Sequence, residues 1–94
     1  MSRLTVLAYD IADDERRRHV ARVCEQRMLR IQESVFEAWM TAVERARLLD
    51  ALRDLIEPSH DQVRLYALAL RETQRRTVLG VMPRAEPTPD YFLV

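Results

Sequence analysis

One acidic residue, Asp10, lies near the end of the first apolar run of the chain and is followed closely by a cluster of arginines. The run covers residues 4–11, and Arg16, Arg17 and Arg18 come soon after it. A carboxylate on the rigid end of a strand can hold a divalent cation, and guanidinium groups beside it can bind a phosphodiester backbone. The arrangement therefore suggests metal-assisted chemistry on a nucleic acid. An acid at a strand end is also a common helix N-cap or turn residue, and that alternative stays open.

The arginines are clustered although the chain as a whole is neutral. All 15 basic residues are arginines and 15 acids balance them, which does not suggest a general nucleic-acid binder. Six of the arginines nevertheless fall within residues 15–30, where only Glu15 and Glu25 oppose them. Genome composition can explain the absence of lysine, but it does not explain this clustering.

Other catalytic signatures are missing from the sequence. Gly80 is the single glycine, so there is no phosphate-binding glycine loop, and His19, Cys24 and His60 do not have the spacing of a zinc site. With one cysteine the chain can form no internal disulfide, which agrees with a reducing compartment. No apolar run approaches the roughly 20 residues that span a bilayer, and the N-terminus lacks the layout of a signal peptide. We expect a cytoplasmic protein.

The hydrophobic pattern of the first half predicts the elements that position Asp10. Residues 4–11 read as a buried strand, and Asp13 or Asp14 can cap the helix that follows. The apolar stripe of that helix is Val20, Val23, Cys24 and Met28. Residues 30–40 are strand-like, but their alternation fails near residues 32–34, which predicts two short strands with a tight connection or one strand with a bulge.

The second half begins with a capping box, in which Thr41 is the N-cap and Glu44 the third helical residue. We expect Pro58 to end this helix. Its predicted apolar stripe is Ala42, Ala46, Leu49, Leu52 and Ile56. Residues 62–70 alternate as a strand, 71–76 read as a polar loop and 77–80 as a brief strand. The tail carries three prolines and an apolar end at residues 91–94, which predicts docking on a partner or a second copy.

The order of these elements predicts a ferredoxin-like α+β fold, βαββαβ, with an extra C-terminal strand. Two helices cover one face of such a sheet, so the apolar residues of the other face favour a homodimer. We divide the chain into a domain of residues 1–80, whose last strand is swapped in the dimer, and a proline-rich tail of residues 81–94.

Three motifs in this order resemble the CRISPR-associated adaptation nucleases, the family of the small second core Cas protein. They are residues 9–21 (YDIADDERRRHVA), 30–37 (RIQESVFE) and 63–66 (VRLY). The resemblance runs from about Leu4 to Gly80. Two positions depart from it: the glycine that commonly precedes the second motif is absent, and His19 stands where some members carry a basic residue.

The resemblance implies a homodimer in which the two copies of Asp10 face each other and bind a divalent metal, usually Mg²⁺. It implies endonuclease activity on RNA or DNA, and a role in spacer acquisition as the bridge between two integrase dimers in a heterohexameric complex. The residues linked to nuclease activity correspond to Asp10, Arg17, Arg30 and Phe36, with Ser34 nearby. The expected nucleic-acid contacts are Arg16, Arg17, Arg18 and Arg30.

Three functions follow as hypotheses. The first is a Mg²⁺-dependent endonuclease or endoribonuclease with Asp10 essential, although no residue is an evident general base. The second is a non-catalytic dimeric scaffold that binds duplex DNA through arginines and recruits the integrase through the tail. The third is a related ferredoxin-like toxin ribonuclease.

Overall fold

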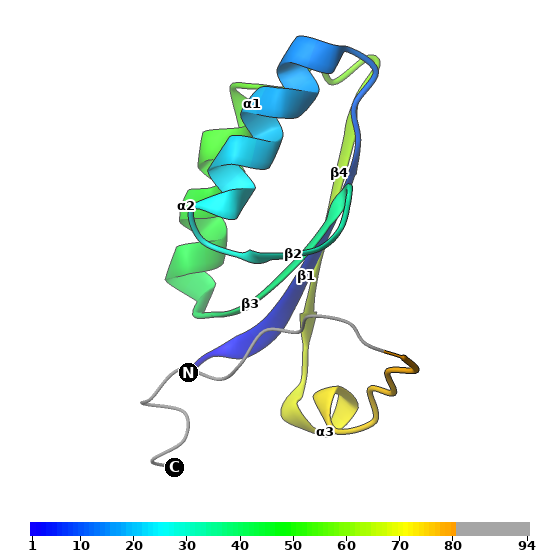
Figure 1. Cartoon of the computed structure of the whole chain (residues 1–94). Coiled ribbons are helices and arrows are strands. Elements are labelled where there is room, and N and C mark those ends of the chain that lie inside the picture. The colour runs from blue at the N-terminus through cyan, green and yellow to red at the C-terminus, as the bar shows by residue number, and fades with distance from the viewer. Residues whose placement is uncertain (81–94) are drawn as a thin grey trace.

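A computed structural model describes residues 1–80 of the chain, so the predicted tail, 81–94, lies outside the described residues. Figure 1 shows four strands and three helices over the described part. They are β1 (Arg3–Asp10), α1 (Asp14–Glu25), β2 (Leu29–Gln32), β3 (Val35–Met40), α2 (Ala42–Arg53), β4 (Gln62–Leu68) and α3 (Leu70–Thr73). Within this part no helix is long and apolar enough to cross a membrane.

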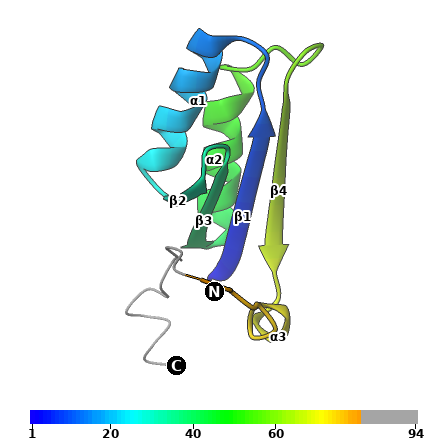
Figure 2. The ribbon, with the colours of Figure 1, turned by 45° about the vertical axis from the view of Figure 1, so that its right-hand side comes forward.

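The four strands form one sheet in the order β2-β3-β1-β4, and each neighbouring pair is antiparallel. Helices α1 and α2 lie together on one face of this sheet (Figures 1 and 2). Helix α1 therefore connects the parallel strands β1 and β2, which have β3 between them. Helix α2 connects the parallel strands β3 and β4, which have β1 between them. This is the ferredoxin-like α+β fold, and the predicted fold class is confirmed.

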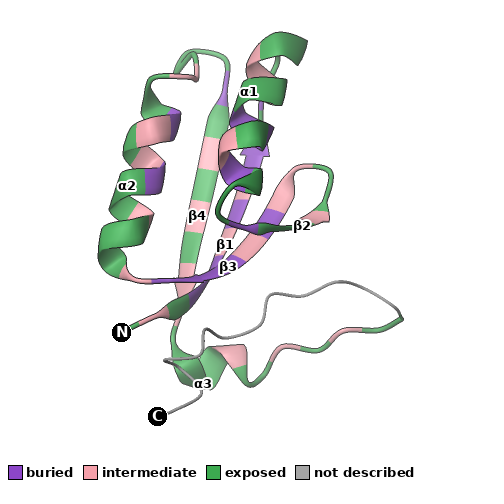
Figure 3. Cartoon of the chain, turned by 60° about the vertical axis from the view of Figure 1, so that its left-hand side comes forward, coloured by how far each residue is buried: buried purple, intermediate pink, exposed green. Residues whose placement is uncertain are grey.

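The core fills the space between the two helices and the sheet. Strand residues alternate, so that Leu7 of β1 is fully buried beside its cross-strand partners Phe36 and Leu65. From α1, Val20 and Cys24 enter the same core, as the spacing predicts. Figure 3 shows the buried residues along the inner faces of the helices and on the central strands.

The predicted apolar stripe of α2 is partly wrong. Ala42 and Ala46 are exposed, while Leu48 and Leu52 are buried. Leu48, Leu52 and Leu55 stand at i, i+4 and i+7, so these three large side chains define the face that packs, and the alanines turn toward solvent. The predicted capping box of Thr41 is present, but the helix ends at Arg53, before Pro58.

Two short strands and a bulge resolve the broken alternation of residues 30–40. Residues 33 and 34 form the turn between β2 and β3, and the register shifts between Arg30 and Gln32. The backbone N–H of Tyr9 donates to the carbonyl of Ser34, with 3.1 Å between nitrogen and oxygen. This turn therefore lies beside the end of β1.

The segment after β4 differs from the prediction. The strand was predicted to run to Leu70, but β4 ends at Leu68. Leu70 begins the short helix α3, which occupies the first part of the predicted loop of residues 71–76. The hydroxyl of Thr73 donates to the carbonyl of Ala69 at 3.2 Å. Residues 77–80 form no strand with the sheet of the same chain. The swapped last strand needs a second copy and stays a prediction.

The face of the sheet away from α1 and α2 is called the open face here. At one end of it Leu4 and Trp39 are buried and pack with Leu68. Arg76 adds an ion pair to Glu37 of β3, with Nη1 3.1 Å from Oε1. Toward the other end Tyr66 is 52% exposed, so the open face keeps accessible apolar surface in the single chain.

Candidate active site at the end of the first strand

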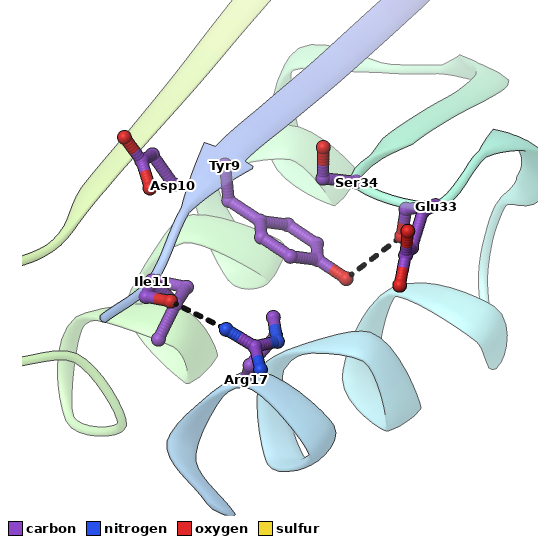
Figure 4. Close-up of a pocket in the computed structure, with 6 residues that line it drawn as sticks. All are labelled: Tyr9, Asp10, Ile11, Arg17, Glu33 and Ser34. Carbon is purple, nitrogen blue, oxygen red and sulfur yellow. Dashed lines mark hydrogen bonds between the residues drawn. The ribbon is translucent and has the colours of Figure 1, made fainter. Parts of the chain in front are cut away.

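Asp10 is the last residue of β1 and lies on the open face. It pairs across the sheet with Gln62, and its side chain is exposed. In Figure 4 its carboxylate points away from the ring of Tyr9 and from Arg17. Among residues 1–80, the Asp10 carboxylate has no hydrogen bond and no ion pair. An exposed carboxylate without internal partners is free to bind a cation.

The N-cap of α1 is Asp13 and not Asp10. Asp13 has an extended backbone, and its Oδ2 accepts a hydrogen bond of 2.9 Å from the backbone N–H of Arg16. That hydrogen bond lowers the pKa of the Asp13 carboxyl. The prediction that Asp13 or Asp14 caps this helix is confirmed for Asp13, and the alternative that Asp10 is the N-cap is wrong.

A pocket of about 240 Å³ opens beside the end of β1 (Figure 4). Its lining comes from β1, α1 and the β2–β3 turn: Tyr9, Asp10, Ile11, Arg17, Glu33 and Ser34. The Tyr9 hydroxyl donates to the carbonyl of Glu33 at 3.2 Å, which ties the turn to the strand. Ser34, which the resemblance places near the site, thus lines the same pocket as Asp10.

Arg17 reaches back from the first turn of α1 to the connection after Asp10. Its Nη1 donates to the carbonyl of Ile11 at 2.9 Å, and its Nη2 contacts the carboxylate of Asp14. The guanidinium lies on the helix side of the strand end, whereas the Asp10 carboxylate lies on the open side (Figure 4). Arg17 therefore contributes positive charge to the pocket and also holds the backbone next to Asp10.

Arg16 makes a different contact, an ion pair with Asp61 in the α2–β4 loop. Its Nε is 2.8 Å from Oδ2 and its Nη2 is 3.2 Å from Oδ1, so both nitrogens face one carboxylate. The hydrogen bond between the two side chains raises the pKa of the Arg16 guanidinium. It also holds the pKa of the Asp61 carboxyl well below its usual range. Sequence reasoning missed Asp61, because no local pattern points to a partner 45 residues away.

Arg30 and Phe36 form one contact at the edge of the core. The Arg30 guanidinium lies 5.2 Å from the ring centroid of Phe36 and donates to the carbonyl of Glu33 at 3.0 Å. It also forms an ion pair of 3.0 Å with Glu25. Phe36 is fully buried and stacks on Tyr9, which lines the pocket. In the single chain Phe36 therefore contacts the pocket lining at Tyr9, and Arg30 contacts it at Glu33.

The structure brings some of the proposed site residues together and separates others. Asp10, Arg17 and Ser34 surround one pocket. Arg18 is exposed on α1, and Arg16 faces the α2–β4 loop. Residues 1–80 of one chain contain no group of three or more acidic, histidine or cysteine side chains that could hold a metal ion. The pocket is lined by two acidic side chains, Asp10 and Glu33. Both supply the oxygen donors that Mg²⁺ prefers, and Asp10 is the one carried on the end of a strand.

Fold and site define a class: a small ferredoxin-like protein whose first strand ends in a free acid beside an arginine-bearing helix. The family model of the CRISPR associated protein Cas2 matches residues 2–78. The chain belongs to this family.

Relatives of known name support the assignment. A CRISPR-associated endoribonuclease Cas2 of Chloroflexus aurantiacus is 39% identical over 89 residues, covering 94% of this chain and 96% of that protein. One of Synechocystis is 33% identical over 84 residues, covering 89% of this chain and 91% of its own length.

Solved structures agree in fold as well as in sequence. A hypothetical protein of Thermus thermophilus superposes with a TM-score of 0.76 at 34% identity, covering 89% of this chain and 98% of its own. Cas2 of Streptococcus pyogenes superposes with a TM-score of 0.70 at 30% identity, covering 82% of this chain and 99% of its own.

Proposed function

We propose that this protein is a Mg²⁺-dependent endoribonuclease whose active site is completed by a second copy of the chain. The observation that carries the proposal is the free, exposed carboxylate of Asp10 at the end of β1. The relatives named above are CRISPR-associated endoribonucleases, and this chain covers nearly their whole length. RNA is therefore the substrate that we propose first.

A homodimer follows from the surface on which Asp10 lies. The open face carries Asp10 at one end and, further along the strands, accessible apolar side chains such as Tyr66, which lies opposite Val6. Packing two open faces against each other would bury that apolar surface and bring two carboxylates to one interface. Two carboxylates with the phosphate of the substrate suit Mg²⁺, which keeps several water ligands.

The residues of the chain divide the work as follows. Asp10 of each copy would hold the ion, and a bound ion would supply polarisation of the scissile phosphate and a lowered pKa of a water ligand. Arg17 brings positive charge to the pocket and keeps the carbonyl of Ile11 in place. Arg18, exposed on the same helix, contacts the phosphate backbone and confers binding that weakens with salt.

The direct test replaces one oxygen of the Asp10 carboxylate. Asp10→Asn should lower Mg²⁺-dependent cleavage of single-stranded RNA by about 100-fold or more, because the ion loses its charged ligand. The melting temperature should not fall, since the side chain is exposed and has no partner among the described residues. Asp50→Asn is the matched control, because it makes the same chemical change at an exposed ion pair on α2. Cleavage that persists in Asp10→Asn, in preparations free of contaminating nuclease, would contradict the proposal.

We also propose that the protein acts in CRISPR spacer acquisition together with the integrase, in the cytoplasm. The family match supports this role over that of a toxin ribonuclease. The apolar residues 91–94 are the proposed integrase contact on sequence grounds. A chain ending at residue 89 should lose co-purification with the integrase while keeping its far-UV circular dichroism and its RNA cleavage. Retained co-purification would show that the contact lies elsewhere.

A further inference from the structure

The connection between β1 and α1 is held by a carboxylate from a distant part of the chain. Asp61 lies in the loop between α2 and β4, and the two connections meet at the same end of the molecule (Figures 1 and 2). Oδ1 of Asp61 accepts from the backbone N–H of Ala12 at 3.0 Å, and Oδ2 accepts from that of Glu57 at 2.9 Å. With the two nitrogens of Arg16, this carboxylate binds four donors.

Burial makes this contact strong. The Asp61 side chain is fully buried, while the Arg16 side chain is 32% exposed. A buried carboxylate is stable only when its oxygens are bonded, and a bidentate guanidinium is the partner that best fits its geometry. Three of the four donors belong to the β1–α1 connection and the helix that follows it.

The position of these donors connects them to Asp10. Ala12 lies two residues beyond Asp10, and Ala12 itself is exposed, so the core does not hold this part of the backbone. Removing the Asp61 contact would leave the end of β1 held by the buried side chain of Ile11, by the hydrogen bond from Arg17 to the Ile11 carbonyl and by the pairing of β1 with its neighbouring strands, but would free the backbone at Ala12. A shift of the strand end would move the Asp10 carboxylate directly.

We propose that Asp61 and Arg16 are positioning residues, which hold the β1–α1 connection so that Asp10 is aimed at the shared metal site. The proposal rests on the proposed function of Asp10. It assigns the Arg16 guanidinium to a contact within the chain, in contrast to the role of phosphate contact that the resemblance implies. Arg18 on the same helix remains available for that contact.

The first experiment separates positioning from stability. Asp61→Asn should lower kcat for RNA cleavage by about 10- to 100-fold and raise the Mg²⁺ concentration for half-maximal cleavage, with KM for RNA nearly unchanged. Assays well below the melting temperature of each variant, with circular dichroism of the same samples, exclude loss through unfolding. Arg16→Lys, which keeps the charge but loses the bidentate contact, should show the same change to a smaller degree. Asp50→Asn and Arg53→Lys are the matched controls, at an exposed pair on α2.

The second experiment separates positioning from phosphate binding. Binding of catalytically inactive Asp10→Asn protein to RNA is measured over a range of salt concentrations. Adding Arg16→Gln should leave the slope of log K against log salt unchanged, whereas adding Arg18→Gln should reduce its magnitude by about 0.7, the value for one phosphate contact on a single strand. An equal reduction by Arg16→Gln would overturn the assignment of Arg16.

The two proposals fail in distinguishable ways. If Asp10→Asn cleaves RNA normally, the proposed function is wrong. If Asp10→Asn is inactive but Asp61→Asn keeps the wild-type kcat and Mg²⁺ dependence, the function stands and the positioning role is overturned. If Asp61→Asn does not fold, Arg16→Lys decides the question by the same two measurements.

Discussion

At the scale of single residues, neighbouring acids of the β1–α1 connection have separate roles. Asp13 caps α1, Asp14 contacts Arg17, and Asp10 has no internal partner among the described residues. Capping and ion pairing stabilise the fold, whereas a free carboxylate on a strand end contributes little to stability and is available for function. This division is the main reason for assigning metal binding to Asp10.

The same scale includes a prediction on pH, which concerns Asp61. The Arg16 guanidinium and the backbone N–H of Glu57 hold the pKa of the Asp61 carboxyl below its usual range. In acid the folded state therefore binds fewer protons at this group than the unfolded state. Its stabilising contribution is fully present above the ordinary aspartate pKa and is lost as the pH falls toward the lowered value.

We expect the melting temperature of Asp61→Asn to lie below that of the wild type near neutral pH. The difference should narrow between about pH 5 and pH 3, because only the wild type loses this contribution on protonation. Thermal unfolding of both proteins, followed by circular dichroism at each pH, measures this difference in melting temperature. In Asp50→Asn the difference from the wild type should be small throughout. A gap for Asp61→Asn that stays constant with pH would contradict the assignment.

Residue types near the site were predictable where the signal is local. Asp10, Arg17 and Ser34 stand out by sequence and motif, and they line one pocket. Asp61 and the contact of Arg16 were not predictable, because that ion pair joins helix α1 to a loop 45 residues further along the chain. Sequence reasoning also treated the arginines as one cluster. In the structure each contacts a different residue: Arg16 contacts Asp61, Arg17 contacts Ile11 and Arg30 contacts Glu33.

At the scale of elements, hydrophobic periodicity located the four strands of the sheet and helix α1. For α2 it predicted the wrong residues for part of the buried face, because that helix has apolar residues on more than one side. Alanine gains little from burial, so the stripe containing Ala42 and Ala46 gave way to the face set by larger side chains. The short helix α3 was missed because its four residues are too few to show a period.

Helix α2 gives a prediction that distinguishes the two faces. Leu48→Ala should lower the free energy of unfolding by about 2–5 kcal/mol, because Leu48 is fully buried and its loss leaves a cavity. Leu49→Ala, at the position that periodicity favoured, should cost less, since Leu49 is half-buried. Urea unfolding of both variants measures the difference. A loss in Leu49→Ala equal to or larger than that in Leu48→Ala would contradict the packing face described for α2.

At the scale of the whole molecule, one chain brings two carboxylates to the pocket, and of these Asp10 is the one carried on a strand. The ferredoxin-like fold places α1 and α2 on one face of the sheet and leaves Asp10 on the other. An acid on an open sheet face meets its copy when two such faces pack around a two-fold axis that passes close to it. We therefore expect activity to depend on the dimer, as the resemblance of the sequence already implies.

The number of divalent ions bound per chain tests this account most directly. Titration of the protein with Mn²⁺, a paramagnetic substitute for Mg²⁺, can be followed by the electron paramagnetic resonance of the free ion, at protein concentrations where sedimentation shows a dimer. We predict one ion for two chains, and loss of that ion in Asp10→Asn but not in Asp50→Asn. One ion for each chain, or binding that Asp10→Asn does not change, would contradict a metal site shared between two copies of Asp10.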